Sequence, residues 1–184
     1  MCRGGISSKI IVLSRYLRPF GYAVCISDID VSRLLSYNIR GIILDIDNTI
    51  IPWGSWEIPE ATREFIKKLK NLGIKCCLLS NTDKKDRAVF IGRELGLPVI
   101  TNAFKPLPFG FFKAINILGL RRQEILSIGD QLFMDVFGSN IVGIRSILVK
   151  PLTDRDFITT RVLRLFERRL IPKVLKEVEY FGDI

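Results

Sequence analysis

The chain has 184 residues, 48% of them hydrophobic, and a net charge of +9, which is typical of one globular domain with appended ends. It contains no histidine, which excludes His-based acid–base chemistry, Ser-His and Cys-His nucleophilic systems and the commonest zinc sites. No apolar run reaches the roughly 18 residues that a membrane-spanning helix needs, so we expect no transmembrane segment.

The positive charge lies at the two ends of the chain. Residues 1–40 carry six basic and two acidic side chains, and residues 161–176 carry six basic and one acidic. Basic ends suit an anionic surface such as phospholipid headgroups or nucleic acid, and they are equally consistent with solvated helix faces. The first 27 residues contain basic residues and no acid, a composition compatible with an organelle-targeting segment, whereas their apolar core is too short for a secretory signal.

From residue 41 onward, short apolar runs alternate with amphipathic stretches. Before them, Asp30 is expected to cap a helix that begins at Val31. The expected strands are 41–45, 74–79, 98–100, 126–128 and 146–149, and the expected helices are 59–71, 83–95, 109–118 and 132–140. This alternation predicts a doubly wound, three-layer α/β sandwich around a mostly parallel five-stranded sheet. Cys76 and Cys77 are expected to be small core residues on opposite faces of a strand.

Beyond Val149 we expect the chain to leave the sheet. Residues 160–171 are predicted to form an amphipathic helix that Pro172 interrupts, followed by a short helical stretch to Tyr180. The apolar arc of the first helix would consist of Val162, Leu163, Phe166 and Leu170, with the arginines largely on the other side. The expected organisation is an N-terminal lead-in (1–40), an α/β core (41–150) and a basic amphipathic C-terminal helical segment (151–184).

Polar side chains follow four of the predicted strands. They are Asp45, Asp47 and Thr49 after the first, Ser80 and Asn81 after the second, Lys105 after the third, and Asp130 and Asp135 after the fourth. Any one of them alone is most simply a turn, a helix cap or a surface charge. Because ligand sites of open parallel sheets lie at the carboxyl ends of the strands, their joint occurrence predicts a site for a phosphate group and a divalent cation.

This set resembles the haloacid dehalogenase (HAD) superfamily of phosphotransferases over residues 41–150. The matching motifs are Asp-x-Asp-x-Thr at 45–49, Ser80 after an apolar strand, Lys105 before Pro106, and Gly-Asp-x-x-x-x-Asp at 129–135. The longer segments 45–53, 80–82 and 104–108 look like the YqeG-like branch of subfamily IIIA. That branch includes phosphatidylglycerophosphate phosphatases of bacteria, plastids and mitochondria.

The resemblance implies a Mg²⁺-dependent phosphatase without a cap domain that acts through an aspartyl-phosphate. Asp45 would be the nucleophile and Asp47 the general acid and base, a role that a raised pKa favours. Mg²⁺ would be held by the Asp45 and Asp130 carboxylates and the Asp47 backbone carbonyl.

The remaining motif residues would bind the phosphate or support the site. The Ser80 hydroxyl, the Asn81 backbone N–H and the Lys105 ammonium would hold the phosphoryl oxygens. Thr49 would brace the first loop, and Asp135 would orient Lys105 or a metal-bound water. Trp53 and Trp56 would close the mouth of the site, contact a lipid interface or pack as a local cluster under the loop.

The intervals between the motifs are too short for a cap domain, and an open site suits a bulky substrate. The favoured function is dephosphorylation of phosphatidylglycerophosphate to phosphatidylglycerol at a membrane surface, in a cytoplasmic protein with peripheral contact to the inner membrane face. The basic C-terminal helix would lie on the anionic bilayer or pack on the sheet.

The alternatives are a soluble phosphatase for a nucleotide, sugar or nucleic-acid 3′-phosphate, and a non-catalytic phosphate- or nucleic-acid-binding scaffold. Nucleic acid is the less favoured partner because the basic ends lack interleaved aromatic residues, and the sequence gives no indication of oligomeric state.

Overall fold

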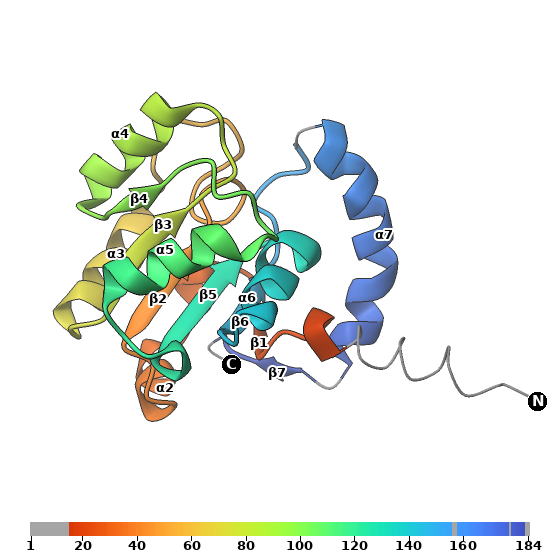
Figure 1. Cartoon of the computed structure of the whole chain (residues 1–184), viewed down its shortest axis with the longest axis horizontal. Coiled ribbons are helices and arrows are strands. Elements are labelled where there is room, and N and C mark those ends of the chain that lie inside the picture. The colour runs from red at the N-terminus through yellow and green to blue at the C-terminus, as the bar shows by residue number, and fades with distance from the viewer. Residues whose placement is uncertain (1–14, 156–157, 177, 183–184) are drawn as a thin grey trace, which may run out of the picture.

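A computed structural model describes residues 15–155, 158–176 and 178–182, with only the backbone at 158–162. One seven-stranded sheet runs in the order β4-β3-β2-β5-β6-β1-β7, and every strand pair in it is parallel. Figure 1 shows this sheet between layers of helices. The predicted doubly wound parallel architecture is therefore confirmed, but the sheet has seven strands rather than five.

Five strands match the predicted ones to within two residues, and two more lie outside residues 41–150. The strands are β1 (Gly21–Ala23), β2 (Gly41–Leu44), β3 (Lys75–Leu79), β4 (Val99–Ile100), β5 (Ile125–Gly129), β6 (Arg145–Val149) and β7 (Glu179–Tyr180). The expected helix up to Tyr180 is wrong, because the chain returns to the sheet edge as β7. Phe181 explains the return: its ring is fully buried, and its backbone N–H donates to the carbonyl oxygen of Tyr22 at 2.7 Å.

The helices cover both faces of the sheet. They are η1 (Ile26–Asp28), α2 (Val31–Ser36), α3 (Glu60–Asn71), α4 (Lys85–Leu95), α5 (Pro108–Leu118), η2 (Arg122–Glu124), the π-helical turn η3 (Leu132–Phe137), α6 (Gly138–Ile141) and α7 (Ile158–Leu175). Phe65 of α3 and Ile91 of α4 pack with Cys76 on one face, whereas Phe111 of α5 packs with Cys77 on the other. The two adjacent cysteines thus belong to opposite halves of the core, as predicted.

The connections that flank the carboxyl edge of the sheet are short. Residues 50–79 contain only α3 and β3, and residues 81–104 contain only α4 and β4, so no cap domain is inserted in either interval of the described chain. Asp30 caps α2 as predicted, because its carboxylate accepts from the backbone N–H groups of Ser32 and Arg33. Within the described ranges, no helix combines the length and hydropathy that a bilayer span requires.

Helix α7 continues through Pro172, so the predicted interruption there is wrong. A proline inside a helix costs about 3 kcal/mol, but Ile171 and Val174 pack against Leu132 and Val136 of η3 on both sides of it. The apolar arc is also shifted from the predicted one. Its buried side runs through Leu170 and Glu167, whereas Phe166 is exposed, and Val162 lies outside the described side chains.

Glu167 ties α7 to the core by a buried hydrogen bond. Its Oε1 atom accepts from the backbone N–H of Phe133 in η3 at 2.9 Å. Burial raises the pKa of the Glu167 carboxyl from 4.5 to about 7, although the Phe133 N–H and the nearby Arg164 guanidinium oppose the shift. The folded chain therefore keeps a proton on Glu167 at pH values where the unfolded chain has lost it.

This shift predicts a pH-dependent loss of stability that Glu167→Gln removes. Between pH 5 and 8 the wild type should lose about 3 kcal/mol of unfolding free energy relative to the variant, because folding raises the carboxyl pKa and Gln does not ionise while still accepting from Phe133. Urea unfolding at several pH values measures this difference. Glu57→Gln at an exposed position is the control and should show none. Parallel pH profiles for the wild type and Glu167→Gln would contradict the burial account.

Candidate active site

The sequence-predicted polar residues gather at the carboxyl edge of the sheet. Asp45 follows β2 directly, and its backbone N–H donates to the carbonyl oxygen of Ile128 in β5 at 3.0 Å. Ser80 follows β3 and Asp130 follows β5. The apolar runs form central strands that are buried on both faces, so each polar residue emerges where its strand ends.

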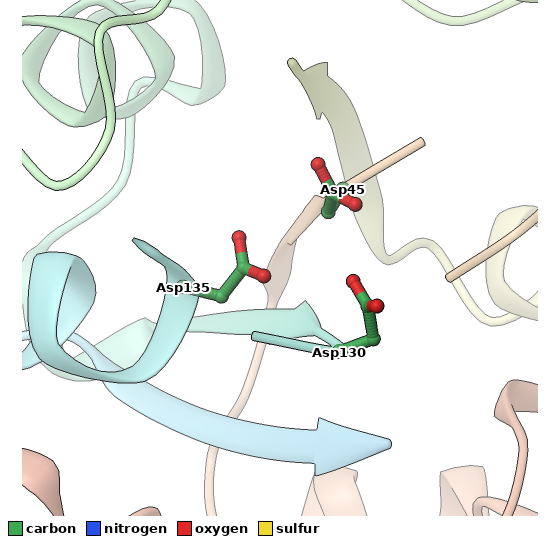
Figure 2. Close-up of side chains that lie close together, drawn as sticks. All are labelled: Asp45, Asp130 and Asp135. Carbon is green, nitrogen blue, oxygen red and sulfur yellow. The ribbon is translucent and has the colours of Figure 1, made fainter. Parts of the chain in front are cut away.

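Three carboxylates converge at this edge. Asp45, Asp130 and Asp135 are all buried, and one oxygen from each lies within 4.8 Å of those of the other two. Figure 2 shows Asp45 and Asp130 approaching from neighbouring strand ends and Asp135 from the turn of η3. Because carboxylates this close repel one another in a buried site, they need compensating positive charge.

Lys105 supplies part of that charge. Its Nζ atom lies 2.6 Å from Asp45 Oδ1 and 2.6 Å from Asp135 Oδ1. The Asn81 side chain holds the backbone of Lys105, accepting from its N–H at 2.7 Å and donating to its carbonyl oxygen at 2.9 Å. Asn81 thus acts through its side chain in positioning Lys105, a contact that the sequence analysis did not anticipate.

Two hydroxyl groups complete the inner part of the site. Thr49 Oγ1 lies between two acids, 3.1 Å from Asp45 Oδ2 and 3.2 Å from Asp130 Oδ1. The buried Ser80 hydroxyl accepts from the backbone N–H of Thr82 at 3.1 Å, which leaves its own proton available to an incoming oxygen.

The surroundings shift the ionisation of this cluster. Burial raises the pKa of Asp45 to about 7, although the Lys105 ammonium opposes the shift. Burial also raises the pKa of Asp130 well above its ordinary value, against the opposing effect of Arg164. For Lys105, burial alone would lower the pKa, but Asp135 and Asp45 together raise it, so the ammonium stays charged.

The donor set fits a divalent cation. Carboxylate oxygens are the ligands that hard cations prefer, and the acids lie close enough to share one ion. The two Asp135 oxygens already accept from Lys105 Nζ and from the Gln131 backbone N–H at 3.1 Å. The Asp45 and Asp130 carboxylates could therefore hold the cation, while Asp135 supports Lys105.

Asp47 lies beside this cluster rather than in it. Its Oδ2 atom accepts from Arg87 Nη2 at 2.5 Å, and its Oδ1 atom accepts from the backbone N–H of Gly54 at 3.1 Å. Arg87 is almost fully buried on α4 and also donates to the carbonyl oxygen of Ser55 at 2.9 Å. The sequence analysis missed Arg87, although an arginine one turn before Ile91 on the apolar stripe of a helix was a usable signal.

Arg164 of α7 also enters the site. Its guanidinium donates to the carbonyl oxygen of Asp130 at 3.1 Å and to the Asp130 carboxylate. We expected the arginines of this helix to face mostly away from its apolar arc, but Arg164 sits three residues before Glu167 on the buried side. The helical spacing alone contained that signal.

The two tryptophans follow the first acid loop. The Trp56 ring packs on Phe90 of α4 with a centroid separation of 5.5 Å, and the Trp53 backbone N–H donates to Asn48 Oδ1 at 3.3 Å. Asn48 adopts a left-handed conformation and also accepts from the Thr153 hydroxyl at 2.7 Å. These contacts fix the loop between β2 and α3 against its neighbours.

The fold and the acid cluster are those of a haloacid dehalogenase-like hydrolase, and the chain belongs to that family. The family model matches residues 54–139. YqeG of Bacillus subtilis (strain 168), described as a probable phosphatase, is 34% identical over 169 residues, covering 90% of this chain and 96% of that protein. The chain is therefore a phosphatase of this family, similar to YqeG.

Two further proteins are more distant. The Arabidopsis thaliana phosphatidylglycerophosphate phosphatase 1, chloroplastic/mitochondrial, is 26% identical over 193 residues, which cover 96% of this chain and 55% of that protein. The crystal structure of an uncharacterized protein from Listeria monocytogenes serotype 4b superposes with a TM-score of 0.54 at 20% identity, covering 65% of this chain and 85% of that one. The similarity to the Listeria protein shows the fold alone.

The raised pKa values predict that divalent-cation binding tightens with pH. Below about pH 7 a proton on Asp45 competes with the cation, and above it the carboxylate is free to bind. Electron paramagnetic resonance titration with Mn²⁺ should therefore give a dissociation constant that falls by about tenfold from pH 6 to pH 8. A pH-independent dissociation constant would mean that Asp45 does not hold the ion.

The buried Arg87–Asp47 pair predicts a positioning role for Arg87. Since a positioned acid–base group contributes about 10²–10⁴-fold, Arg87→Met should lower kcat about tenfold to a hundredfold with little change in KM. Arg87→Lys retains the charge but cannot reach both Asp47 and the Ser55 carbonyl as a guanidinium does. Its kcat should therefore lie between that of the wild type and that of Arg87→Met. Steady-state kinetics on an aryl phosphate measures this order. Equal kcat in all three proteins would refute the role.

Proposed function

We propose that the protein is a Mg²⁺-dependent phosphomonoesterase that forms an aspartyl-phosphate on Asp45 and removes the terminal phosphate of phosphatidylglycerophosphate at a membrane surface. The convergence of Asp45, Asp130 and Lys105 carries the chemical part of this proposal. When bound between the acids, Mg²⁺ would neutralise charge on the phosphoryl oxygens.

In the first step, the Asp45 carboxylate attacks phosphorus while Asp47 donates a proton to the leaving alkoxide oxygen. Water then attacks the aspartyl-phosphate, and Asp47 accepts its proton. Asp47 therefore has to turn between its pair with Arg87 and the reacting oxygens. Its side chain is partly exposed and sits at the edge of the cluster, which leaves room for that movement.

The phosphoryl oxygens would be held by groups at the end of β3 and in the loop after β4. The Lys105 ammonium already contacts Asp45, and the Ser80 hydroxyl lies at the end of the adjacent strand. The backbone N–H of Asn81 would be the third donor. These donors would stabilise the charge that spreads over the phosphoryl oxygens in the transition state.

The lipid part of the proposal rests on other observations. A more distant relative is a phosphatidylglycerophosphate phosphatase by name, and no cap domain covers the site in the described intervals. The outward face of α7 exposes Leu165 and Phe166 beside the basic residues Arg168 and Arg169. Apolar and basic side chains together suit an anionic bilayer.

A substrate panel tests the proposal. Phosphate release should be fastest with phosphatidylglycerophosphate in mixed micelles, compared with a nucleotide, a sugar phosphate and an aryl phosphate, and EDTA should abolish it. Asp45→Asn should reduce turnover on every substrate by about 10³-fold or more, because the amide is not a nucleophile.

Asp86→Asn, the same change at an exposed position of α4, is the matched control and should leave turnover unchanged. A clear preference for the nucleotide or the sugar phosphate would replace the lipid substrate by a soluble one. Full Mg²⁺-dependent activity in Asp45→Asn would remove the proposed nucleophile.

A further inference from the structure

Three large apolar side chains are exposed immediately around the buried Lys105. Phe104 is 66% exposed, Leu107 51% and Phe109 62%, all within six residues of chain. They lie in the loop between β4 and α5 and in the first turn of α5. Scattered exposed apolar residues are common on protein surfaces, but three large ones beside one buried lysine of the site form a patch.

The backbone holds this patch in a fixed shape. Phe104 adopts a left-handed conformation with φ at 53°, which is unusual for a bulky residue and is maintained only where its surroundings require it. The Leu107 N–H donates to the Phe104 carbonyl oxygen at 2.8 Å, and Asn81 holds Lys105 between them. The apolar side chains thus face solvent from a segment that is anchored at the site.

A surface hollow lies between two residues of the patch and Asn81, whose side chain holds the Lys105 backbone. It is lined by Asn81, Asn102, Phe104, Lys105, Pro106 and Leu107. Phe104 and Leu107 of the patch supply apolar walls of the hollow, and Asn81 and Asn102 supply polar ones. A molecule with an apolar body and a phosphate end could contact both at once.

The segment that carries the patch has one outward basic side chain, Lys113, and residues 95–123 contain no acidic one. Lys113 lies one helical turn after Phe109 on the exposed side of α5, where its long stem can accompany the apolar residues while its ammonium reaches outward. Because residues 95–123 contain no acidic side chain, this segment would not repel anionic headgroups.

We infer that Phe104, Leu107 and Phe109 insert into the interfacial region of a bilayer that contains anionic phospholipid, and that Lys113 contacts its headgroups. Docking there places the mouth of the site at headgroup depth, beside Lys105. The inference deepens the proposed function and rests on it for the lipid substrate, but the docking itself can be measured without turnover.

The test is flotation with vesicles of phosphatidylglycerol and phosphatidylcholine. The variant combines Phe104→Asn, Leu107→Ser and Phe109→Gln, chosen because Asn tolerates a left-handed backbone, Ser is a favoured N-cap and Gln suits a helix. The vesicle partition coefficient should fall about tenfold or more, since three apolar side chains no longer leave water. Turnover of a soluble aryl phosphate should stay within about twofold of the wild type, since no group in the site is changed.

A matched control removes apolar surface at the opposite edge of the sheet. Leu72→Asn, Ile117→Gln and Ile141→Gln alter exposed residues at the carboxyl ends of α3, α5 and α6, away from the carboxyl ends of the strands. This control should float like the wild type. Equal flotation of the wild type and the Phe104/Leu107/Phe109 variant would overturn the inference, as would failure of the wild type to bind the vesicles.

The two proposals fail in different ways. If the wild type floats through this patch but does not hydrolyse phosphatidylglycerophosphate added to the same vesicles, the docking surface holds and the substrate assignment is wrong. If the wild type hydrolyses that lipid while the variant floats and hydrolyses it equally well, the substrate assignment holds and the docking surface is wrong. Loss of aryl phosphate turnover in the variant would also count against the inference, because the patch would then be part of the site itself.

Discussion

The site depends on the burial of three carboxylates beside one ammonium group. Asp45, Asp130 and Asp135 converge with Lys105 where water is largely excluded, and burial raises the pKa values of Asp45 and Asp130 accordingly. Such an arrangement is costly for a structural core, since uncompensated buried charge destabilises the folded state. A divalent cation and a phosphoryl group would resolve that imbalance, because the cation would neutralise the acids and the phosphoryl oxygens would accept from the Lys105 ammonium.

Two arginines from distant helices bring further positive charge to the acids at this edge of the sheet. Arg87 of α4 pairs with Asp47, and Arg164 of α7 pairs with Asp130. The C-terminal helix is therefore connected to the acids by a direct ion pair and by the Glu167 contact to η3. The Arg164 guanidinium therefore contacts the same Asp130 carboxylate that is expected to hold the cation.

Much of the fold could be predicted from the sequence, because buried strands and short crossovers leave strong local patterns. The apolar runs gave β2 to β6, and Asp45, Ser80, Lys105 and Asp130 stood where those runs ended. β1 and β7 could not be found this way, since each is two or three residues long and depends on distant pairing of Tyr22 with Tyr180. The helical spacing marked Arg87 and Arg164 as lying on the buried sides of their helices, but the acids that they contact depend on how α4 and α7 pack, which no local pattern contains. The prediction at Pro172 was wrong for the opposite reason. Proline usually interrupts a helix, but apolar contacts on both sides of Pro172 keep α7 continuous.

The most direct measurement of the central claim is a crystal structure of the protein with Mg²⁺ and beryllium trifluoride, which mimics a phosphoryl group on an aspartate. The account predicts beryllium bonded to a carboxylate oxygen of Asp45, Mg²⁺ between Asp45 and Asp130, and fluorine atoms about 3 Å from Lys105 Nζ and Ser80 Oγ. Beryllium on another residue, or a Mg²⁺ ion bound away from Asp130, would contradict it.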